Sequence, residues 1–263
     1  RGFNKRRKIM EISDNKEVQI KQEIVRFAEC QEDEQFRALQ AIRIITASEV
    51  VHQANFDLIL TSGILPRIMN LANNGTGEER NEALWILLNL ASGNSQTLML
   101  LLETGLLNTA LAALNRGDSA SIENGLWILG NIAGDCEQAR DKVLSVGALP
   151  NVIQVLSNSD SKSIWTNGLW VLCNLCRCGS YPPQFQQIEL AIPVFLAVLT
   201  RGDDDAGDCL WGLAYVCSTG AEATATCLQR GILEVVIPQL NQISTFRTPA
   251  LQILYHISTY EEH

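Results

Sequence analysis

The sequence lacks the motifs that mark most enzyme active sites. It contains no G-x-G-x-x-G turn, no P-loop, no H-E-x-x-H and no G-x-S-x-G. Histidine is scarce, and the three histidines, His52, His256 and His263, share no motif. The adjacent carboxylates of residues 203–205 follow a glycine, and this is more typical of a solvated loop than of an acid and base pair. We therefore expect a protein without catalytic activity.

Long hydrophobic runs are absent too. The most apolar stretch, residues 98–114, is broken by Glu103, Thr104, Gly105 and Asn108, and a membrane-spanning helix needs about 20 predominantly apolar residues. The sequence has no apolar signal-peptide core, and its first residue is Arg rather than Met. We expect a soluble protein, without membrane insertion, whose natural start has been removed.

Cysteine spacing does not indicate a metal site. Cys173, Cys176 and Cys178 form C-x-x-C-x-C, but no histidine or second cysteine pair stands nearby at zinc-finger spacing. The other cysteines are scattered, as small reduced core residues would be: Cys30, Cys136, Cys209, Cys217 and Cys227. We expect no metal, no cofactor and a reducing compartment, the cytosol or the nucleus.

No Gly/Ser-rich or Pro-rich linker interrupts the body of the chain. Residues 1–20 differ from the rest, because they hold a basic block at residues 5–8 and a polar stretch without an apolar period. Such a segment is typically disordered when unbound. We expect one elongated repeat domain over residues 21–263, preceded by this mostly disordered basic segment.

The charge balance limits the class of partner. The chain has 29 acidic and 20 basic residues, a formal charge of −9, and the basic start makes the remaining body more acidic still. Such a field attracts cationic partners and repels nucleic acid and anionic membranes. The alternative is that the acidity only keeps the protein soluble.

Four tryptophans recur with a period. They are separated by 42, 43 and 41 residues, and each is followed four residues later by a hydrogen-bonding side chain. An i, i+4 pair lies on one helix face, and a period of about 40 residues is typical of armadillo or HEAT repeats. We predict an all-α solenoid of the armadillo or HEAT kind. The pairs are Trp85/Asn89, Trp127/Asn131, Trp170/Asn174 and Trp211/Tyr215.

Stacked repeats would align these pairs into a ladder, and its chemistry favours one kind of ligand. Indole rings at one-repeat spacing can hold Lys or Arg stems, with a cation–π attraction of roughly 0.5–1 kcal/mol at exposed sites. An Asn side chain can bond both the N–H and the C=O of an extended backbone. We predict binding of an extended basic peptide. The alternative is that the tryptophans pack in the core, but a polar i+4 partner in all four pairs favours the groove.

Glycines at a common phase predict the turns between helices. Glycine would end one helix, and proline would stand near the start of the next. The glycines are Gly63, Gly105, Gly147 and Gly231, and prolines follow three of them at Pro66, Pro150 and Pro238.

Five motifs carry a family resemblance. Residues 82–93 (E-A-L-W-I-L-L-N-L-A-S-G), 126–135 (L-W-I-L-G-N-I-A-G-D) and 167–177 (N-G-L-W-V-L-C-N-L-C-R) are followed by the Trp211/Tyr215 repeat and by residues 248–252 (T-P-A-L-Q). This ordered series resembles successive armadillo repeats of importin-α over residues 34 to 260. The resemblance implies an all-α, right-handed armadillo-repeat solenoid of about six repeats. It also implies an adaptor that binds nuclear localisation signals, couples them to importin-β, and moves between cytoplasm and nucleus.

The resemblance also implies a major site in which a key lysine of the signal meets Asp135, with Gly93 and Thr97 as further pocket residues. The chain is one residue shorter than the family pattern between Gly93 and Thr97. Read from the residues alone, Asp135 lies four positions after Asn131, where the negative end of a helix dipole also favours an ammonium group. The alternative is a carboxylate that caps the next helix through Arg140 or backbone N–H groups.

Polar residues just before three ladder tryptophans share their helix face, so that they can meet flanking cations or peptide backbone. They are Glu123, Asn124, Asn167 and Asp208.

Some positions depart from the family pattern. Gln252 and His256 stand where the family has Arg and Asn, and Ala47 and Ser48 replace its Ser-Arg pair. The chain ends at His263, before the later repeats of the family. We expect either a fragment or a short relative, and no complete minor site.

The basic block resembles the end of the family's importin-β-binding segment, which occupies the groove when the carrier is absent. The resemblance implies that Lys5 reaches Asp135, in the same molecule or in a neighbour, with Arg6, Arg7 and Lys8 beside it. Tethering raises the effective concentration of such a segment. The alternative is a disordered basic tail.

Two other function classes fit the sequence less well. A β-catenin-like armadillo scaffold would call for a basic groove, and the acidic body argues against it. Nothing in the sequence indicates a regulatory subunit of an enzyme.

Overall fold

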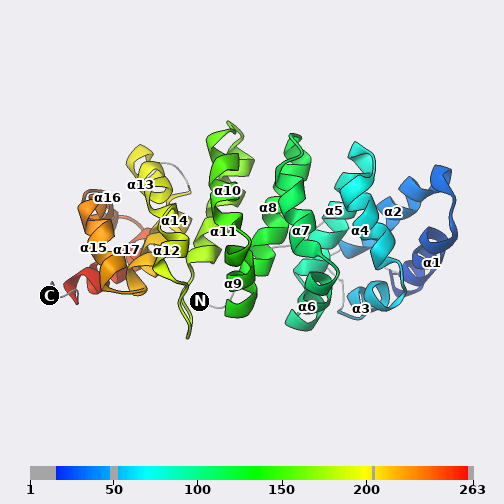
Figure 1. Cartoon of the computed structure of the whole chain (residues 1–263), viewed down its shortest axis with the longest axis horizontal. Helices are drawn as coiled ribbons and strands as arrows, with labels where there is room; N and C mark the ends of the chain where they lie inside the picture. The colour runs from blue at the N-terminus through cyan, green and yellow to red at the C-terminus, as the bar shows by residue number, and fades with distance from the viewer. Residues whose placement is uncertain (1–15, 48–52, 203–204, 260–263) are drawn as a thin grey trace. The chain divides into compact units, whose positions relative to one another are not determined.

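The structure is a computed structural model that describes residues 16–47, 53–202 and 205–259. Within these ranges the chain forms α-helices and one short 3-10 helix, and no strand (Figure 1). The predicted all-α class is confirmed.

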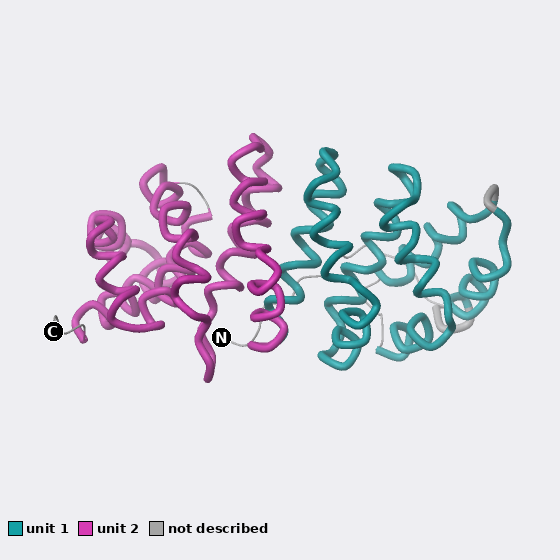
Figure 2. The backbone as a smooth tube through the Cα atoms, in the orientation of Figure 1, with its two compact units in different colours: residues 1–135 teal, residues 136–263 magenta. Residues whose placement is uncertain are grey.

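The chain divides into two compact units, residues 1–135 and residues 136–263 (Figure 2). The sequence predicted one uninterrupted domain. Repeat proteins confine contacts to neighbouring repeats, so groups of repeats form compact units of their own. Each unit is therefore described separately.

Unit 1 contains helices α1 to α8, in which a short helix, a middle helix and a longer third helix follow one another. The repeats α3–α4–α5 and α6–α7–α8 are complete, and α2 precedes them. The helices are α1 (Lys16–Glu29), α2 (Glu32–Thr46), α3 (Gln53–Thr61), α4 (Leu65–Asn74), α5 (Gly77–Ala91), α6 (Ser95–Glu103), α7 (Leu106–Leu114) and α8 (Ser119–Ala133).

Unit 2 continues the same pattern with α9–α10–α11, α12–α13–α14 and a last group ending in α17. The helices are α9 (Glu137–Ser145), α10 (Ala148–Ser157), α11 (Lys162–Cys176), α12 (Phe185–Ile188), α13 (Ala191–Arg201), α14 (Ala206–Ser218), α15 (Ala221–Gln229), α16 (Ile232–Val236), η1 (Ile237–Asn241) and α17 (Ser244–Ser258).

The third helices carry the ladder residues, and they pack against one another within each unit. In unit 1, α5 packs between α2 and α8; in unit 2, α14 packs between α11 and α17. Their inward faces are buried leucine and isoleucine, such as Leu84 and Leu87 of α5 and Ile128 of α8. Burial of these side chains is the main favourable term in holding the repeats together.

Local sequence signals start the third helices. Thr76 and Glu79 form a reciprocal capping box at the start of α5. Asp118 caps α8 by accepting from the Ser121 N–H, and Ser161 caps α11 in the same way. A hydrogen bond from Gln35, then one from the Thr76 backbone, lowers the pKa of Glu79.

The predicted glycine turns are confirmed. Gly63, Gly105, Gly147 and Gly231 have φ angles of 82°, 93°, 73° and 80°, which L side chains rarely adopt. Pro66 stands in the first turn of α4, as predicted.

One boundary differs from the prediction. Helix α1 begins at Lys16, inside the segment 1–20 that was expected to be mostly disordered. Its apolar residues Ile20, Ile24 and Phe27 recur at helical spacing and are buried. Residues 1–15 lie outside the described part of the chain.

In the described ranges no single helix is both long and apolar enough to cross a membrane. Helices α6 and α7 reach the required length and composition only as a pair, and the pair is bent by 76°.

Candidate peptide-binding site

The first two Trp/Asn pairs lie on adjacent helices of unit 1. Trp85 and Trp127 are half-buried, whereas Asn89 and Asn131 are buried. The Asn131 side chain donates from Nδ2 to the backbone oxygen of Leu88 at 3.1 Å. This amide therefore joins α8 to α5, a role that the sequence analysis had not foreseen.

A second hydrogen bond joins the same two helices about two turns earlier along α8. Asn124 Nδ2 donates to the Asn81 backbone oxygen at 3.5 Å, with the same offset of 43 residues as the Asn131 bond. Ser121 Oγ donates to Asn81 Oδ1 at 3.1 Å, and Glu123 is half-buried beside these residues in the sequence. The offset of one repeat thus places the polar face of α8 directly along α5.

Arg43 lies against the first ladder tryptophan, a contact that the sequence did not predict. Its guanidinium carbon lies 4.5 Å from the centroid of the Trp85 ring, and its Nε forms an ion pair with Glu82. A cation over an indole ring is the interaction that the ladder was predicted to offer to a ligand. The signal was present, because Arg43 precedes Trp85 by 42 residues, the ladder interval.

The predicted lysine pocket gathers three segments of unit 1. Asp135 follows the end of α8, is 8% exposed, and accepts a hydrogen bond from Ser95 Oγ at 3.0 Å. Thr97 is buried in the first turn of α6, and its hydroxyl accepts from Gln53 Nε2 at 2.6 Å. A Cβ added to Gly93 would lie 3.3 Å from Thr97 Cγ2. Gly93 therefore lies close to Thr97, and the hydrogen bond from Ser95 joins this segment to Asp135.

The residues named in the alternative role for Asp135, capping of the next helix, are described within unit 2. The N-cap of α9 is Cys136, without a side-chain cap bond. The guanidinium of Arg140 bonds to Asp141 and to the backbone oxygens of Arg177 and Tyr181.

Unit 2 carries the other two pairs in a different state of burial. Trp170 is 1% exposed and Asn174 is buried in α11, whereas Trp211 and Tyr215 are half-buried in α14. The Trp211 and Tyr215 rings stack with centroids 5.8 Å apart and a tilt of 32°. Trp170 therefore resembles a core residue more than the other three ladder tryptophans do.

The remaining predicted residues of unit 2 lie on the expected helices. Asn167 Nδ2 donates to Ser163 Oγ at 3.5 Å, one turn away on α11, and Asp208 is half-buried in the first turn of α14. The predicted N-terminal residues Lys5, Arg6, Arg7 and Lys8 lie outside the described residues.

The cysteine motif falls on and just after α11. Cys173 and Cys176 are buried in the helix, and burial raises the pKa of the Cys176 thiol. Cys178 bonds to the Tyr215 backbone oxygen at 3.2 Å. Within the ranges that the structure describes, no group of three or more His, Cys, Asp or Glu side chains is arranged to hold a metal ion.

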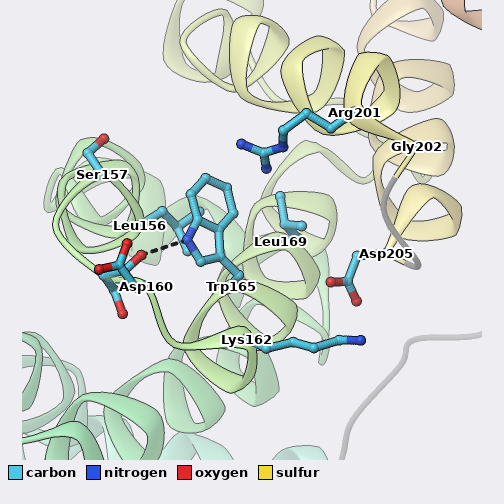
Figure 3. Close-up of a pocket in the computed structure, with 10 residues that line it drawn as sticks. Leu156, Ser157, Asp160, Lys162, Trp165, Leu169, Arg201, Gly202 and Asp205 are labelled. Atoms are coloured by element: carbon cyan, nitrogen blue, oxygen red, sulfur yellow. Dashed lines mark hydrogen bonds between the residues drawn. The ribbon is translucent and has the colours of Figure 1, made fainter.

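A cavity of about 660 Å³ in unit 2 contains none of the predicted site residues (Figure 3). Trp165 lines it, with its indole N–H donating to the Ser159 oxygen at 2.8 Å and the Arg201 guanidinium carbon 5.0 Å from its ring centroid. Lys162, Arg201, Asp160 and Asp205 supply charges of both signs. This balance favours no single charge in a ligand.

Sequence comparison finds relatives among importins. The chain is 30% identical over 207 residues to "Importin subunit alpha-3" of Arabidopsis thaliana, covering 78% of this chain and 39% of the relative. It is 27% identical over 97 residues to "Importin subunit alpha-4" of the same organism, covering 36% of this chain and 18% of the relative. The chain thus spans well under half the length of the curated relatives it matches. No family model matches it.

Solved structures with the same fold include designed proteins. A designed armadillo repeat protein in complex with the peptide (KR)4 superposes with a TM-score of 0.79 at 19% identity, covering 90% of this chain and 99% of that one. An engineered protein superposes with a TM-score of 0.78 at 20% identity, covering 91% and 98%. By its fold, the chain is an armadillo-repeat protein.

Proposed function

We propose that this protein is a nuclear import adaptor. It binds Lys/Arg-rich nuclear localisation signals, in an extended conformation, on the Trp/Asn ladder and links the cargo to an importin-β carrier. In this role it shuttles between cytoplasm and nucleus. The observation that carries the proposal is the series Trp127, Asn131 and Asp135, at four-residue intervals along and just past α8.

The chemistry of this series suits a lysine side chain. The Trp127 ring can receive the methylene stem, and Asp135 supplies a carboxylate that Ser95 already orients. The C-terminal end of α8 adds the negative end of its dipole to the same place. A charge-assisted hydrogen bond to an ammonium group is stronger than a bond between neutral groups.

The relatives favour the same ligand class. The two Arabidopsis thaliana proteins are named importin alpha subunits, and the designed armadillo protein of the same fold holds an alternating Lys-Arg peptide. The net charge of −9 also favours a cationic ligand.

The second candidate is an armadillo scaffold that binds other peptides. Two observations favour it: Trp170 is buried, and the Asn131 amide is engaged by the Leu88 oxygen. Both are structural uses of ladder residues. In this case the ladder would hold the repeats together while a ligand binds elsewhere.

The test is a titration of a labelled Lys/Arg-rich localisation peptide with the protein, followed by fluorescence anisotropy. Submicromolar binding is expected, to be lost when the key lysine of the peptide is alanine and weakened by salt. An acidic amphipathic peptide serves as the competing probe. Binding of the acidic peptide in place of the basic one would favour the scaffold.

The proposed link to importin-β is tested by a separate measurement. Purified importin-β should bind the full chain and lose most of its affinity when residues 1–9 are removed. Equal binding to both chains would count against a carrier-binding role for the basic block.

A further inference from the structure

The ladder of unit 1 begins with an arginine of the chain itself. Arg43 precedes Trp85 by 42 residues, the interval that separates Trp85 from Trp127, so it occupies the ladder position of the preceding repeat. We infer that Arg43 is a built-in first rung, which closes the α2 side of Trp85 to cationic ligand side chains. It thereby determines where recognition of a basic peptide starts. The inference rests on the proposed function for its consequence in ligand binding.

The geometry makes Arg43 a fixed part of the site. Its guanidinium carbon lies 4.5 Å from the Trp85 ring centroid, and its Nε is paired with Glu82. The Arg43 and Glu82 side chains are only 10% and 16% exposed. A planar guanidinium that both stacks on an indole and bonds a carboxylate holds the ring in one orientation.

The helix order decides which side of Trp85 is closed. Arg43 belongs to α2, and α2 packs against α5. Trp127 belongs to α8, which also packs against α5. Arg43 therefore approaches Trp85 from the α2 side, and the slot toward Trp127 is where a ligand cation would stack first.

A ligand cation is unable to replace Arg43 at low cost. Displacement would break the ion pair and leave Glu82 as a poorly hydrated carboxylate without its cation, which is strongly unfavourable. Removal of Arg43 by mutation leaves Glu82 without its cation. The Glu82 carboxylate and the indole face that Arg43 had covered then form a cation site that a ligand side chain can fill.

The test compares the full chain with Arg43→Ala and with the matched control Arg37→Ala, which removes an exposed arginine from the same helix. A labelled basic peptide is titrated with and without one extra lysine at either end. In Arg43→Ala, the extra lysine at one end should improve affinity about fivefold. In the parent and in Arg37→Ala, the gain should be less than twofold. Equal gains in all three proteins would overturn the inference.

A second readout does not depend on peptide binding. Methylguanidinium is titrated into each protein carrying 15N-labelled tryptophan, and the indole N–H signal of Trp85 is followed after assignment with Trp85→Phe. A saturable shift in Arg43→Ala, absent from the parent and Arg37→Ala, supports the internal rung. No saturable shift in Arg43→Ala overturns it.

The two readouts separate the possible failures. If methylguanidinium fills the vacated slot but no basic peptide binds the parent, the rung stands and the proposed function fails. If the basic peptide binds the parent but neither readout responds to Arg43→Ala, the proposed function stands and the rung fails. Arg43→Gln, which keeps most of the side-chain volume, should give the same pattern and replaces Arg43→Ala if that variant does not fold.

Discussion

Asn131 is a buried residue whose amide joins two repeats through the bond to the Leu88 oxygen. Asn131→Asp keeps the shape but replaces the donor by a carboxylate that faces a backbone oxygen. We expect the free energy of unfolding to fall by about 1–3 kcal/mol, the usual cost of a buried polar group without its partner. Chemical denaturation measures this change.

The matched control is Asn70→Asp on α4. Asn70 is exposed, and its Oδ1 accepts from Asn74 Nδ2, a role that aspartate retains. The free energy of unfolding of Asn70→Asp should differ from that of the parent by less than about 0.5 kcal/mol, as is usual for surface substitutions. Equal effects of the two substitutions would show that the Asn131 bond contributes nothing specific.

His256 gives the C-terminal repeat a dependence on pH. Burial lowers the pKa of this imidazole in the last turn of α17, and its ring lies edge-on to Tyr255 with centroids 5.4 Å apart. The unfolded chain takes up a proton near the usual pKa of about 6.5, before the folded chain does. The contribution of His256 is therefore present above that pH and is lost as the pH falls through the lowered pKa.

We expect the melting temperature of the parent to fall further than that of His256→Gln when the pH is lowered from about 7.5 to 5. Thermal melts of both proteins in matched buffers check this. Parallel curves would mean that the histidine is equally hydrated in both states.

At the residue scale, the sequence predicts on which helix a side chain lies better than it predicts which residue that side chain contacts. The i, i+4 spacing correctly places each ladder pair on one helix, because helix geometry is local. The bond from Asn131 to Leu88 and the stack of Arg43 on Trp85 join residues about one repeat apart. Arg43 stands at the ladder phase, but the ladder pattern is defined by tryptophan and does not include an arginine.

Among the elements, the turns need glycine because of the backbone conformation. At Gly147 this effect can be measured apart from side-chain packing. Gly147 has a φ of 73°, and a Cβ at this position would meet no atom within 4 Å. Gly147→Ala should therefore lower the free energy of unfolding by roughly 1–2 kcal/mol through backbone strain alone. Denaturant titration gives the value.

Gly77, the first residue of α5, supplies the comparison, since a Cβ there also meets no atom and its φ is not in the left-handed region. Gly77→Ala should be neutral or slightly stabilising. If both variants lost stability, side-chain packing would be the cause, and the account of the turn would be wrong.

Helix existence and type follow from the sequence, while one boundary does not. The repeat period and the glycine phase predict the helices, whereas the caps at Thr76, Asp118 and Ser161 are known from the structure. Helix α1 begins before the predicted boundary, since its buried face is set by packing on α2. Its few apolar residues stand among many polar ones, so the apolar period was not recognised in the sequence.

For the whole molecule, the basic block and the groove are expected to compete. If residues 5–8 occupy the ladder, they act as a tethered ligand at an effective concentration towards the millimolar range. Deleting residues 1–9 should then tighten binding of a basic peptide. Fluorescence anisotropy with both chains checks this, and unchanged affinity would contradict self-inhibition.

Concentration dependence separates the two forms of self-inhibition. Docking within one molecule is independent of protein concentration, whereas docking to a neighbour produces self-association that grows with concentration. Sedimentation of the full chain and of the chain lacking residues 1–9 distinguishes them.

The repeat period in the sequence predicts an all-α solenoid, and the ordered motif series selects the armadillo form. The described residues have this fold, which the designed armadillo proteins share. The division after Asp135 was not predicted, because the period runs through it without a break. The period also does not distinguish a tryptophan that lines a groove from one that is buried, as Trp170 is.

The central claim is that a basic peptide binds beside Asp135, and one substitution tests it most directly. Anisotropy titrations of a labelled Lys/Arg-rich peptide would compare the parent, Asp135→Lys, and Glu103→Lys, an exposed residue of unit 1 with the same charge change. The account predicts that Asp135→Lys loses at least about tenfold in affinity, as expected when a charge-assisted bond becomes a repulsion, while Glu103→Lys stays within about twofold of the parent. Equal affinities for Asp135→Lys and Glu103→Lys would contradict the account.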